Sequence, residues 1–166
     1  MRRFLGIVFS FVLAGAWFAG DYFSKIWAVE HLSYGSKKII PFLDFHLAFN
    51  EGAAFSMLSN QGGWQKWFFI LLAILVGLWL IWELLFEKLD MTARFAYASI
   101  LGGAAGNAYD RWIDGKVVDF ILVYYKEHSF PIFNVADIGI TIGAVVIVMY
   151  AIANWWGANS ITAIRR

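Results

Sequence analysis

The chain has 166 residues, of which 61% are apolar and 15% are charged, whereas an average soluble domain has about 45–50% and about 25%. A soluble domain of this size needs more charge to stay in solution, so the composition argues for a protein embedded in lipid. The net charge of +1 offers no basic field for nucleic acid, and the absence of cysteine rules out thiol nucleophiles, disulfides and iron–sulfur clusters.

Four apolar runs are candidates for membrane-spanning helices, each of which needs about 20 mostly apolar residues. We place them at residues 4–22, 65–86, 93–110 and 137–156. The sequence therefore predicts an all-α membrane protein with four transmembrane helices, in one domain over residues 1–166. The first run has an alternative interpretation as a cleaved signal peptide, because Arg2 and Arg3 precede it and Ala14-Gly15-Ala16 lies near its end.

The two long connections between the predicted spans carry signals for β-strands. Apolar and polar residues alternate over residues 43–50, a period of two that is typical of a strand with one apolar face. Asn50-Glu51-Gly52 indicates a turn, and residues 53–58 a returning strand. Residues 117–125 are β-prone and apolar on both faces. We expect a small β-sheet and a long loop at the membrane surface.

Small residues in the third and fourth predicted spans indicate close helix packing. Ala98, Gly102 and Gly106 lie four residues apart, and Gly139 and Gly143 repeat this spacing. Small side chains at this interval share one face of a helix and let two backbones approach closely in lipid. We therefore expect both spans to lie close to neighbouring helices.

With four spans, the ends of the first and third and the starts of the second and fourth share one membrane face. Unusual polar residues gather at that face: Asp21, Ser24, Lys25, Asn50, Asn107, Asp110, Arg111, Asp119 and Asp137. Ionisable groups at a membrane boundary are costly and usually pair or do chemistry. Asp21 and Lys25 lie four residues apart on a helix and can form an ion pair. Asn107 and Arg111 repeat the spacing and would present two donors to one place.

Asp119 and Asp137 are the most informative of these residues, because each lies in an apolar stretch. Two carboxyl groups brought together in an apolar site cannot both ionise cheaply, so one keeps its proton and the pair holds an acid and a base. Such a pair suits the attack of water on a peptide carbonyl.

Two alternatives for these aspartates stay open on the pattern alone. In the first, Asp137 only caps the fourth helix and Asp119 only pairs with a nearby cation. The candidate cations are Arg111 and Lys116. In the second, the carboxylates belong to an ion pathway, because charges inside a membrane often mark one.

Five blocks of residues follow one another between Gly20 and Tyr150. They are Asp21-Tyr22-Phe23-Ser24-Lys25; Asn50-Glu51-Gly52-Ala53-Ala54-Phe55; Gly102-Gly103-Ala104-Ala105-Gly106-Asn107-Ala108-Tyr109-Asp110-Arg111; Val117-Val118-Asp119-Phe120; and Phe133-Asn134-Val135-Ala136-Asp137. In residues, order and spacing, these blocks resemble the lipoprotein signal peptidases (signal peptidase II), the aspartic peptidases of bacterial membranes. One departure is Tyr22, where the family usually has glutamine.

The resemblance implies a role for each matching polar residue. Asp119 and Asp137 match the catalytic pair of the family, whereas Asp21 and Lys25 match a pair that supports the structure. The residues that match substrate-binding or dyad-positioning groups are Asn50, Gly52, Asn107, Arg111 and Asn134. Neither a metal nor a cofactor is implied.

The resemblance also implies a substrate, a location and an inhibitor. The family cleaves prolipoproteins whose cysteine already carries a diacylglyceryl group, and it cuts just before that cysteine. Both termini are cytoplasmic in the bacterial inner membrane, which places the site and the small sheet at the extracytoplasmic face. We further expect inhibition by globomycin, contact with membrane lipid, no nucleic-acid partner, and a monomer.

A function of another class is a small ion- or proton-transporting membrane protein that uses the same aspartates. An ion that crosses the membrane needs polar residues at several depths. The sequence instead places them at one face, and it leaves the second and fourth apolar runs without a charge.

Overall fold

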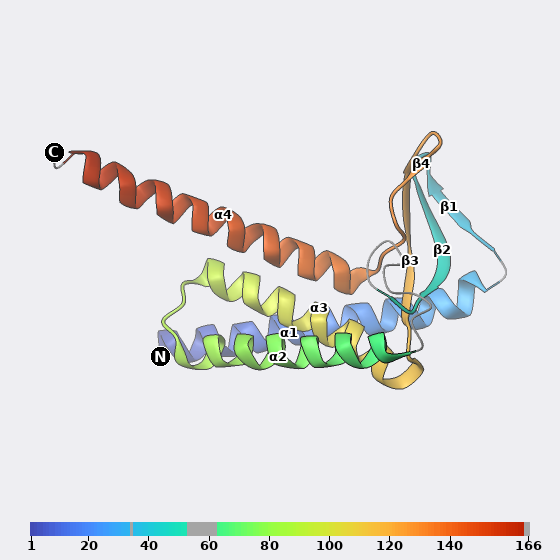
Figure 1. The fold of residues 1–166 in the computed structure, drawn as a ribbon, viewed down its shortest axis with the longest axis horizontal. Coiled ribbons are helices and arrows are strands. Elements are labelled where there is room, and N and C mark those ends of the chain that lie inside the picture. Colours follow the sequence, from blue (N-terminus) through green and yellow to red (C-terminus); the bar gives the residue numbers. More distant parts are fainter. Residues whose placement is uncertain (34, 53–62, 165–166) are drawn as a thin grey trace.

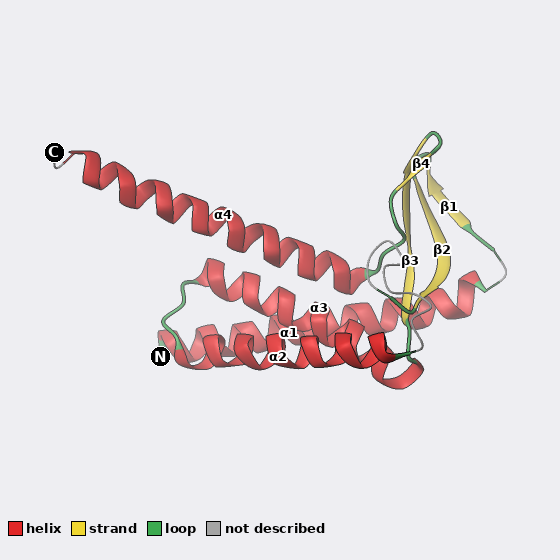
Figure 2. Ribbon diagram, viewed as in Figure 1, coloured by secondary structure: helices red, strands yellow, loops and turns green. Residues whose placement is uncertain are grey.

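The computed structural model describes residues 1–33, 35–52 and 63–164, with the side chains described as far as residue 156. Within these ranges the chain forms four helices and four strands (Figures 1 and 2). In chain order they are α1 (Arg2–Leu32), β1 (Lys37–Ile40), β2 (Leu43–Asn50), α2 (Trp64–Phe86), α3 (Met91–Asp114), β3 (Val117–Tyr125), β4 (His128–Ser129) and α4 (Val135–Ile164). Four helices are thus confirmed, and the returning strand predicted at 53–58 lies outside the described residues.

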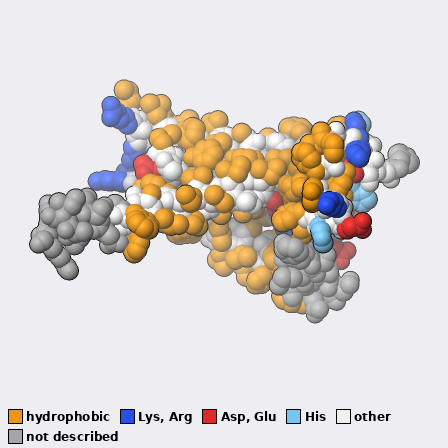
Figure 3. Space-filling model, turned by 90° about the horizontal axis from the view of Figure 1, so that it is seen from above, with side chains coloured by type: hydrophobic (Ala, Val, Ile, Leu, Met, Phe, Trp, Pro, Cys, Tyr) orange, Lys and Arg blue, Asp and Glu red, His pale blue; other side chains and the backbone are white. Residues whose placement is uncertain are grey.

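Three of the four helices are long and apolar enough to cross a membrane, namely α1, α2 and the part of α4 that ends at Trp156. Many large apolar side chains along them are exposed, as along α2 at Leu71, Leu75 and Leu78. Figure 3 shows apolar side chains over much of the helical surface. A surface of this kind suits lipid rather than water. Among the described helices, α3 is the one that does not meet these criteria.

The third helix is distinctive because it packs against all three of the others. It is rich in glycine and alanine, which add little hydropathy but let helices approach. A Cβ atom at Gly102 would collide with the backbone oxygen of Ala14 in α1, and one at Gly103 with that of Ala136 in α4. The predicted close packing through small residues is therefore confirmed, and the same residues explain why α3 is less apolar than its neighbours.

The strands form one antiparallel sheet in the order β1-β2-β3-β4. The strands predicted at 43–50 and 117–125 are both confirmed. The arrangement differs from the prediction, because β2 lies between β1 and β3 and so joins the two long connections in one sheet. The segment predicted as a long surface loop is largely part of this sheet. Residues 117–120 are buried on both faces, which explains why β3 lacks a polar alternation.

An apolar cluster attaches the sheet to the bundle. Ala28 and Leu32 in the last turns of α1 pack with Phe120 of β3, and Trp27 and Phe45 cover them. Figure 1 shows the sheet at the end of the bundle where α1 ends and α4 begins. Because Asp119 is the neighbour of Phe120 in β3, this cluster places its carboxyl group beside the first turn of α4.

Candidate active site

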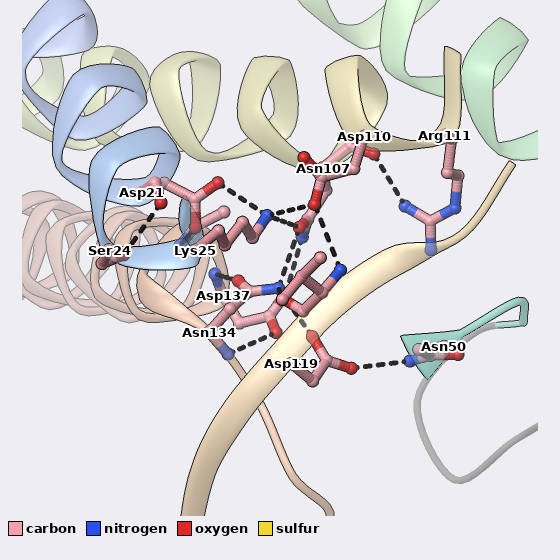
Figure 4. A network of polar contacts seen from close by, with 12 residues as sticks. Asp21, Ser24, Lys25, Asn50, Asn107, Asp110, Arg111, Asp119, Asn134 and Asp137 are labelled. Atoms are coloured by element: carbon pink, nitrogen blue, oxygen red, sulfur yellow. Dashed lines mark hydrogen bonds and ion pairs between the residues drawn. The ribbon is translucent and has the colours of Figure 1, made fainter. Parts of the chain in front are cut away.

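The predicted polar residues lie together in one network at the sheet end of the bundle. Figure 4 shows how side chains from α1, α3, β2, β3 and the start of α4 point toward one another. The residues that the view labels are Asp21, Ser24, Lys25, Asn50, Asn107, Asp110, Arg111, Asp119, Asn134 and Asp137. The prediction that these residues share one end of the bundle is therefore confirmed.

One residue, Asn134, connects the two candidate carboxylates through its side chain and its backbone. Its Nδ2 donates to Oδ1 of Asp119 over 2.7 Å, and its backbone N–H donates to Oδ2 of Asp137 over 3.2 Å. Its Oδ1 in turn accepts from the backbone N–H of Asp137 over 2.9 Å. Asn134 is fully buried, so these contacts hold both carboxyl groups in a site with little water.

The hydrogen bonds between Asn134 and Asp137 have the form of a capping box at the start of α4. The backbone oxygen of Asn134 accepts from the N–H of Ile138, which makes Asn134 the cap residue, and Asp137 is the third residue of the helix. The capping interpretation of Asp137 is thus confirmed. It does not exclude chemistry, because Asn107 Nδ2 also donates to Asp137 Oδ1 over 2.8 Å.

Asp119 is 3% exposed and accepts hydrogen bonds on both oxygens. Besides the bond from Asn134, its Oδ2 accepts from Asn50 Nδ2 over 3.1 Å. Burial raises the pKa of Asp119 to about 6, and the nearby charge of Asp137 acts in the same direction. The carboxyl group therefore keeps its proton to a higher pH than an ordinary aspartate, because its surroundings penalise the charged form.

The alternative in which Asp119 forms a salt bridge is wrong. Within the described ranges, neither Arg111 nor Lys116 forms an ion pair with it. Lys116 instead lies 3.9 Å from the ring centre of Phe49. Arg111 donates from Nη2 to the backbone oxygen of Gly52 over 2.9 Å. Both cations are therefore held by contacts with groups other than a carboxylate.

Arg111 and Asn107 do not reach one place, although both lie on one face of α3. Asn107 turns toward Asp137, whereas the longer side chain of Arg111 reaches Gly52 and stacks 4.8 Å from the ring centre of Phe69. Gly52 N–H donates to Asn50 Oδ1 over 3.0 Å. Arg111 therefore affects the site indirectly, because its hydrogen bond to Gly52 holds the turn that orients Asn50.

Lys25 is the charged centre of the network and is almost fully buried. Its Nζ lies 2.6 Å from Asp21 Oδ2 and 2.9 Å from Asp110 Oδ2. It also donates to Asn107 Oδ1 over 3.0 Å, and Asp21 Oδ1 accepts from the backbone N–H of Ala136 over 2.8 Å. These contacts tie α1 to α3 and to the first turn of α4.

Asp110 belongs to the polar set predicted from the sequence, where it has no assigned role. In the structure it pairs with Lys25 and accepts from the backbone N–H of Val118 over 3.2 Å. Asp110 follows Asn107 by three residues, so the two lie on neighbouring positions of one helix face. That spacing was a usable signal for a second partner of Lys25.

The fold and this network define a membrane protein with one buried and one half-buried carboxyl group, both of which accept hydrogen bonds from Asn134. The family model described as signal peptidase (SPase) II matches residues 4–153. The chain is 45% identical to the lipoprotein signal peptidase of Dichelobacter nodosus, over 84% of this chain and 90% of that protein. It is 47% identical to the lipoprotein signal peptidase of Acinetobacter baumannii, over 78% of this chain and 74% of that protein.

Two solved structures, each described as a bacterial membrane enzyme, have the same fold. One has a TM-score of 0.79 at 30% identity and covers 87% of this chain and 88% of its own, and the other has a TM-score of 0.74 at 30% identity, with 86% and 91% covered. The chain belongs to the signal peptidase II family. It is a membrane protease that removes signal peptides from prolipoproteins. Membership of a protease family decides against the ion-transport alternative.

Proposed function

We propose that Asp119 and Asp137 are the catalytic pair that hydrolyses the peptide bond. The observation that carries this proposal is the bridge of Asn134, which holds both carboxyl groups in one buried network. Two carboxyl groups so placed share protons as a pair and provide an acid and a base together. This is the chemistry that attack by water on a peptide carbonyl requires.

Asp137 is the base and Asp119 the acid in this proposal. Asp137 lies in the first turn of α4, where the helix dipole favours a negative charge, and it accepts hydrogen bonds from Asn107 and from the backbone of Asn134. Asp119 is the member that takes up a proton more easily than an ordinary aspartate, because burial raises its pKa to about 6. The raised pKa of Asp119 therefore marks it as the acid of the pair.

The reaction then follows from these protonation states. Asp137 takes a proton from water as the water oxygen attacks the scissile carbonyl carbon. Asp119 donates a hydrogen bond to the carbonyl oxygen, and the negative charge that develops there is stabilised by this donor. When the carbon–nitrogen bond breaks, the proton held by Asp137 passes to the leaving amine, and the new acid and amine are released.

The surrounding residues position this pair or the peptide. Asn107 orients Asp137, and Asn50 orients Asp119 through contacts from their amide nitrogens. Gly52 and Arg111 fix Asn50. The support by Asp21 and Lys25 is structural, because their ion pair ties helices together and makes no described contact with either catalytic carboxyl group.

The membrane arrangement completes the proposal. All four helices cross the inner membrane, α3 being shielded from lipid by its three neighbours. Both termini are cytoplasmic, and the sheet and the site lie at the extracytoplasmic face. The substrate carries diacylglyceryl on the cysteine that follows the cut, so its acyl chains stay in lipid while the peptide reaches the network. The enzyme acts as a monomer and is inhibited by globomycin.

The test is cleavage of a purified diacylglyceryl-modified prolipoprotein, followed by a shift on a gel. Wild type should cleave it, globomycin should block cleavage, and the precursor without the lipid should resist. Asp119→Asn and Asp137→Asn should each lower the rate by roughly 10²- to 10⁴-fold, the range that an acid or base contributes. The larger loss belongs to Asp137→Asn, because an amide can still donate a hydrogen bond but cannot act as a base.

Asp44→Asn is the matched control for these variants. Asp44 lies in the same sheet and accepts from the hydroxyl of Tyr124 over 3.0 Å, away from the bridge of Asn134. It should cleave at the wild-type rate. Full activity of Asp119→Asn or Asp137→Asn would show that the assigned pair is not catalytic. If well-folded wild type does not cleave the prolipoprotein, the proposed substrate is wrong.

A further inference from the structure

Two buried polar atoms near the candidate active site have no hydrogen-bond partner within the part of the chain that the structure describes. One is Oε1 of Gln65, and the other is Nε of Arg111. Gln65 is 3% exposed and lies in the first turn of α2. A buried acceptor or donor that lacks a partner lowers the stability of a protein. Oε1 of Gln65 can therefore accept a further hydrogen bond, and Nε of Arg111 can donate one.

The two residues lie where α2 and α3 pack against each other. Phe69 follows Gln65 by four residues and shares its helix face, and its ring centre is 4.8 Å from the guanidinium carbon of Arg111. Lys66 donates to the backbone oxygen of Trp112 over 3.4 Å. The first turn of α2 thus meets the last turns of α3, so the two unpaired atoms belong to one region.

Arg111 is held firmly even though one of its nitrogens is unpaired. Nη2 donates to the backbone oxygen of Gly52 over 2.9 Å, and Nη1 to that of Asn107 over 3.3 Å. From Gly52 the hydrogen bonds continue through Asn50 to Asp119. The region of Gln65 is therefore connected to the carboxyl pair by a short chain of contacts.

We propose that Gln65 and Arg111 bind the backbone of the peptide substrate. Oε1 of Gln65 accepts from an amide N–H of the peptide, and Nε of Arg111 donates to a backbone carbonyl oxygen near it. An extended peptide offers donors and acceptors in alternation, so it satisfies both atoms whatever side chains it carries. The proposal rests on the proposed function and assigns the recognition of its substrate to a residue outside the five sequence blocks.

The first experiment compares Gln65→Met with wild type in cleavage of a synthetic diacylglyceryl peptide. Methionine has a similar shape but cannot accept this hydrogen bond. We expect KM to rise roughly ten-fold while kcat stays within about two-fold, the pattern for a contact that substrate and transition state share. The Tm of the free enzyme should stay equal or rise, because an unpaired buried atom has been removed. Lys66→Met, the adjacent and more accessible position, should change neither constant.

The second experiment changes the substrate. Each backbone amide near the cleavage site is replaced in turn by an ester, which removes one N–H. At one position the ester should raise the wild-type KM roughly ten-fold and leave the KM of Gln65→Met unchanged, since the two changes remove the same contact.

Three results would overturn the proposal. They are an unchanged KM in Gln65→Met, a Tm that falls together with kcat, and esters that affect wild type and variant equally. If wild type cleaves the peptide and one of these results is found, the proposal for Gln65 is wrong but the proposed function stays supported. Absence of cleavage by wild type would remove both.

Discussion

The buried cations at the two ends of the helical bundle have different kinds of partner. At the end that carries the sheet, Lys25 lies between two carboxylates, Asp21 and Asp110. At the other end, Arg94 is 3% exposed, yet within the described ranges it has no ion pair with a carboxylate. Among the described residues, the buried cation therefore forms ion pairs at the sheet end and not at the other end.

The arginines at the second end meet backbone carbonyl groups. Arg94 Nη1 donates to the oxygen of Leu84 over 3.1 Å. Arg3 Nη2 donates to the oxygens of Leu85 and Phe86 over 2.8 and 3.0 Å. The last carbonyl groups of a helix lack partners within it and carry the negative end of its dipole. These arginines therefore close the end of α2 and join it to α1 and α3.

The two ends of the bundle therefore have different roles: one end closes α2, and the other carries the candidate catalytic groups. At the arginine end, Arg3 and Arg94 donate hydrogen bonds to backbone carbonyl groups, which do not titrate. The sheet end combines carboxyl groups of unlike environment. Among the described residues, the buried side-chain atoms of Gln65 and Arg111 that lack a hydrogen-bond partner also lie at this end, with the candidate catalytic pair.

The largest effect on stability should follow removal of the cation at the sheet end. Lys25→Met leaves Asp21 and Asp110 buried without their partner, so we expect a loss of about 3–5 kcal/mol in the free energy of unfolding. Reversible unfolding in mixed micelles measures it, with the exposed Lys38→Met as control. A loss below about 1 kcal/mol would mean that water already solvates these carboxylates.

A smaller effect should appear in how stability depends on pH. Asp119 keeps its proton up to a pKa of about 6, whereas an unfolded carboxyl group loses it near 3.8. The folded state then binds more protons between these values, so stability falls as pH rises from about 4 to 6 and stays lower above. Asp119→Asn should lack this fall. Between pH 4 and pH 7, its free energy of unfolding should therefore rise relative to that of wild type by on the order of 1–3 kcal/mol.

The check is the Tm of both proteins at pH 4 and pH 7. The difference in Tm between Asp119→Asn and wild type should grow toward pH 7. Parallel pH profiles would show that Asp119 ionises normally in the folded protein, and the acid role proposed for it would then be withdrawn.

The smallest effect should follow a change at the arginine end. Arg94→Met removes one hydrogen bond, from Arg94 Nη1 to the backbone oxygen of Leu84. We expect a loss of about 1 kcal/mol. The cleavage rate per folded molecule should not change. A fall in that rate would mean that the two ends are coupled, contrary to the comparison drawn above.

The helices and two strands were predictable because their signals are local. Apolar runs predict the helices, and the alternation over residues 43–50 predicts β2. The close approach at Gly102 was visible in the spacing of small residues. The collection of polar residues at one end followed from the number of spans alone, because that number fixes which helix ends are neighbours.

Pairing between distant segments was not predictable in this way. No local pattern near residues 43–50 indicates that β2 pairs with β3. The bridge by Asn134 depends on β3 and the first turn of α4 being side by side. The reach of Arg111 to Gly52 depends on side-chain length and on that same sheet. These contacts come from tertiary packing, which a local pattern does not record.

The pairing of β2 with β3 has a consequence for the synthesis of the protein. Asn50 and Asp119 are separated in the chain by two whole helices, and Asn134 and Asp137 come later still. A growing chain therefore has no complete carboxyl pair until the ribosome has passed the start of the last helix. If Asp119 and Asp137 are the catalytic pair, as proposed, a nascent chain that has not yet reached Asp137 has no proteolytic activity.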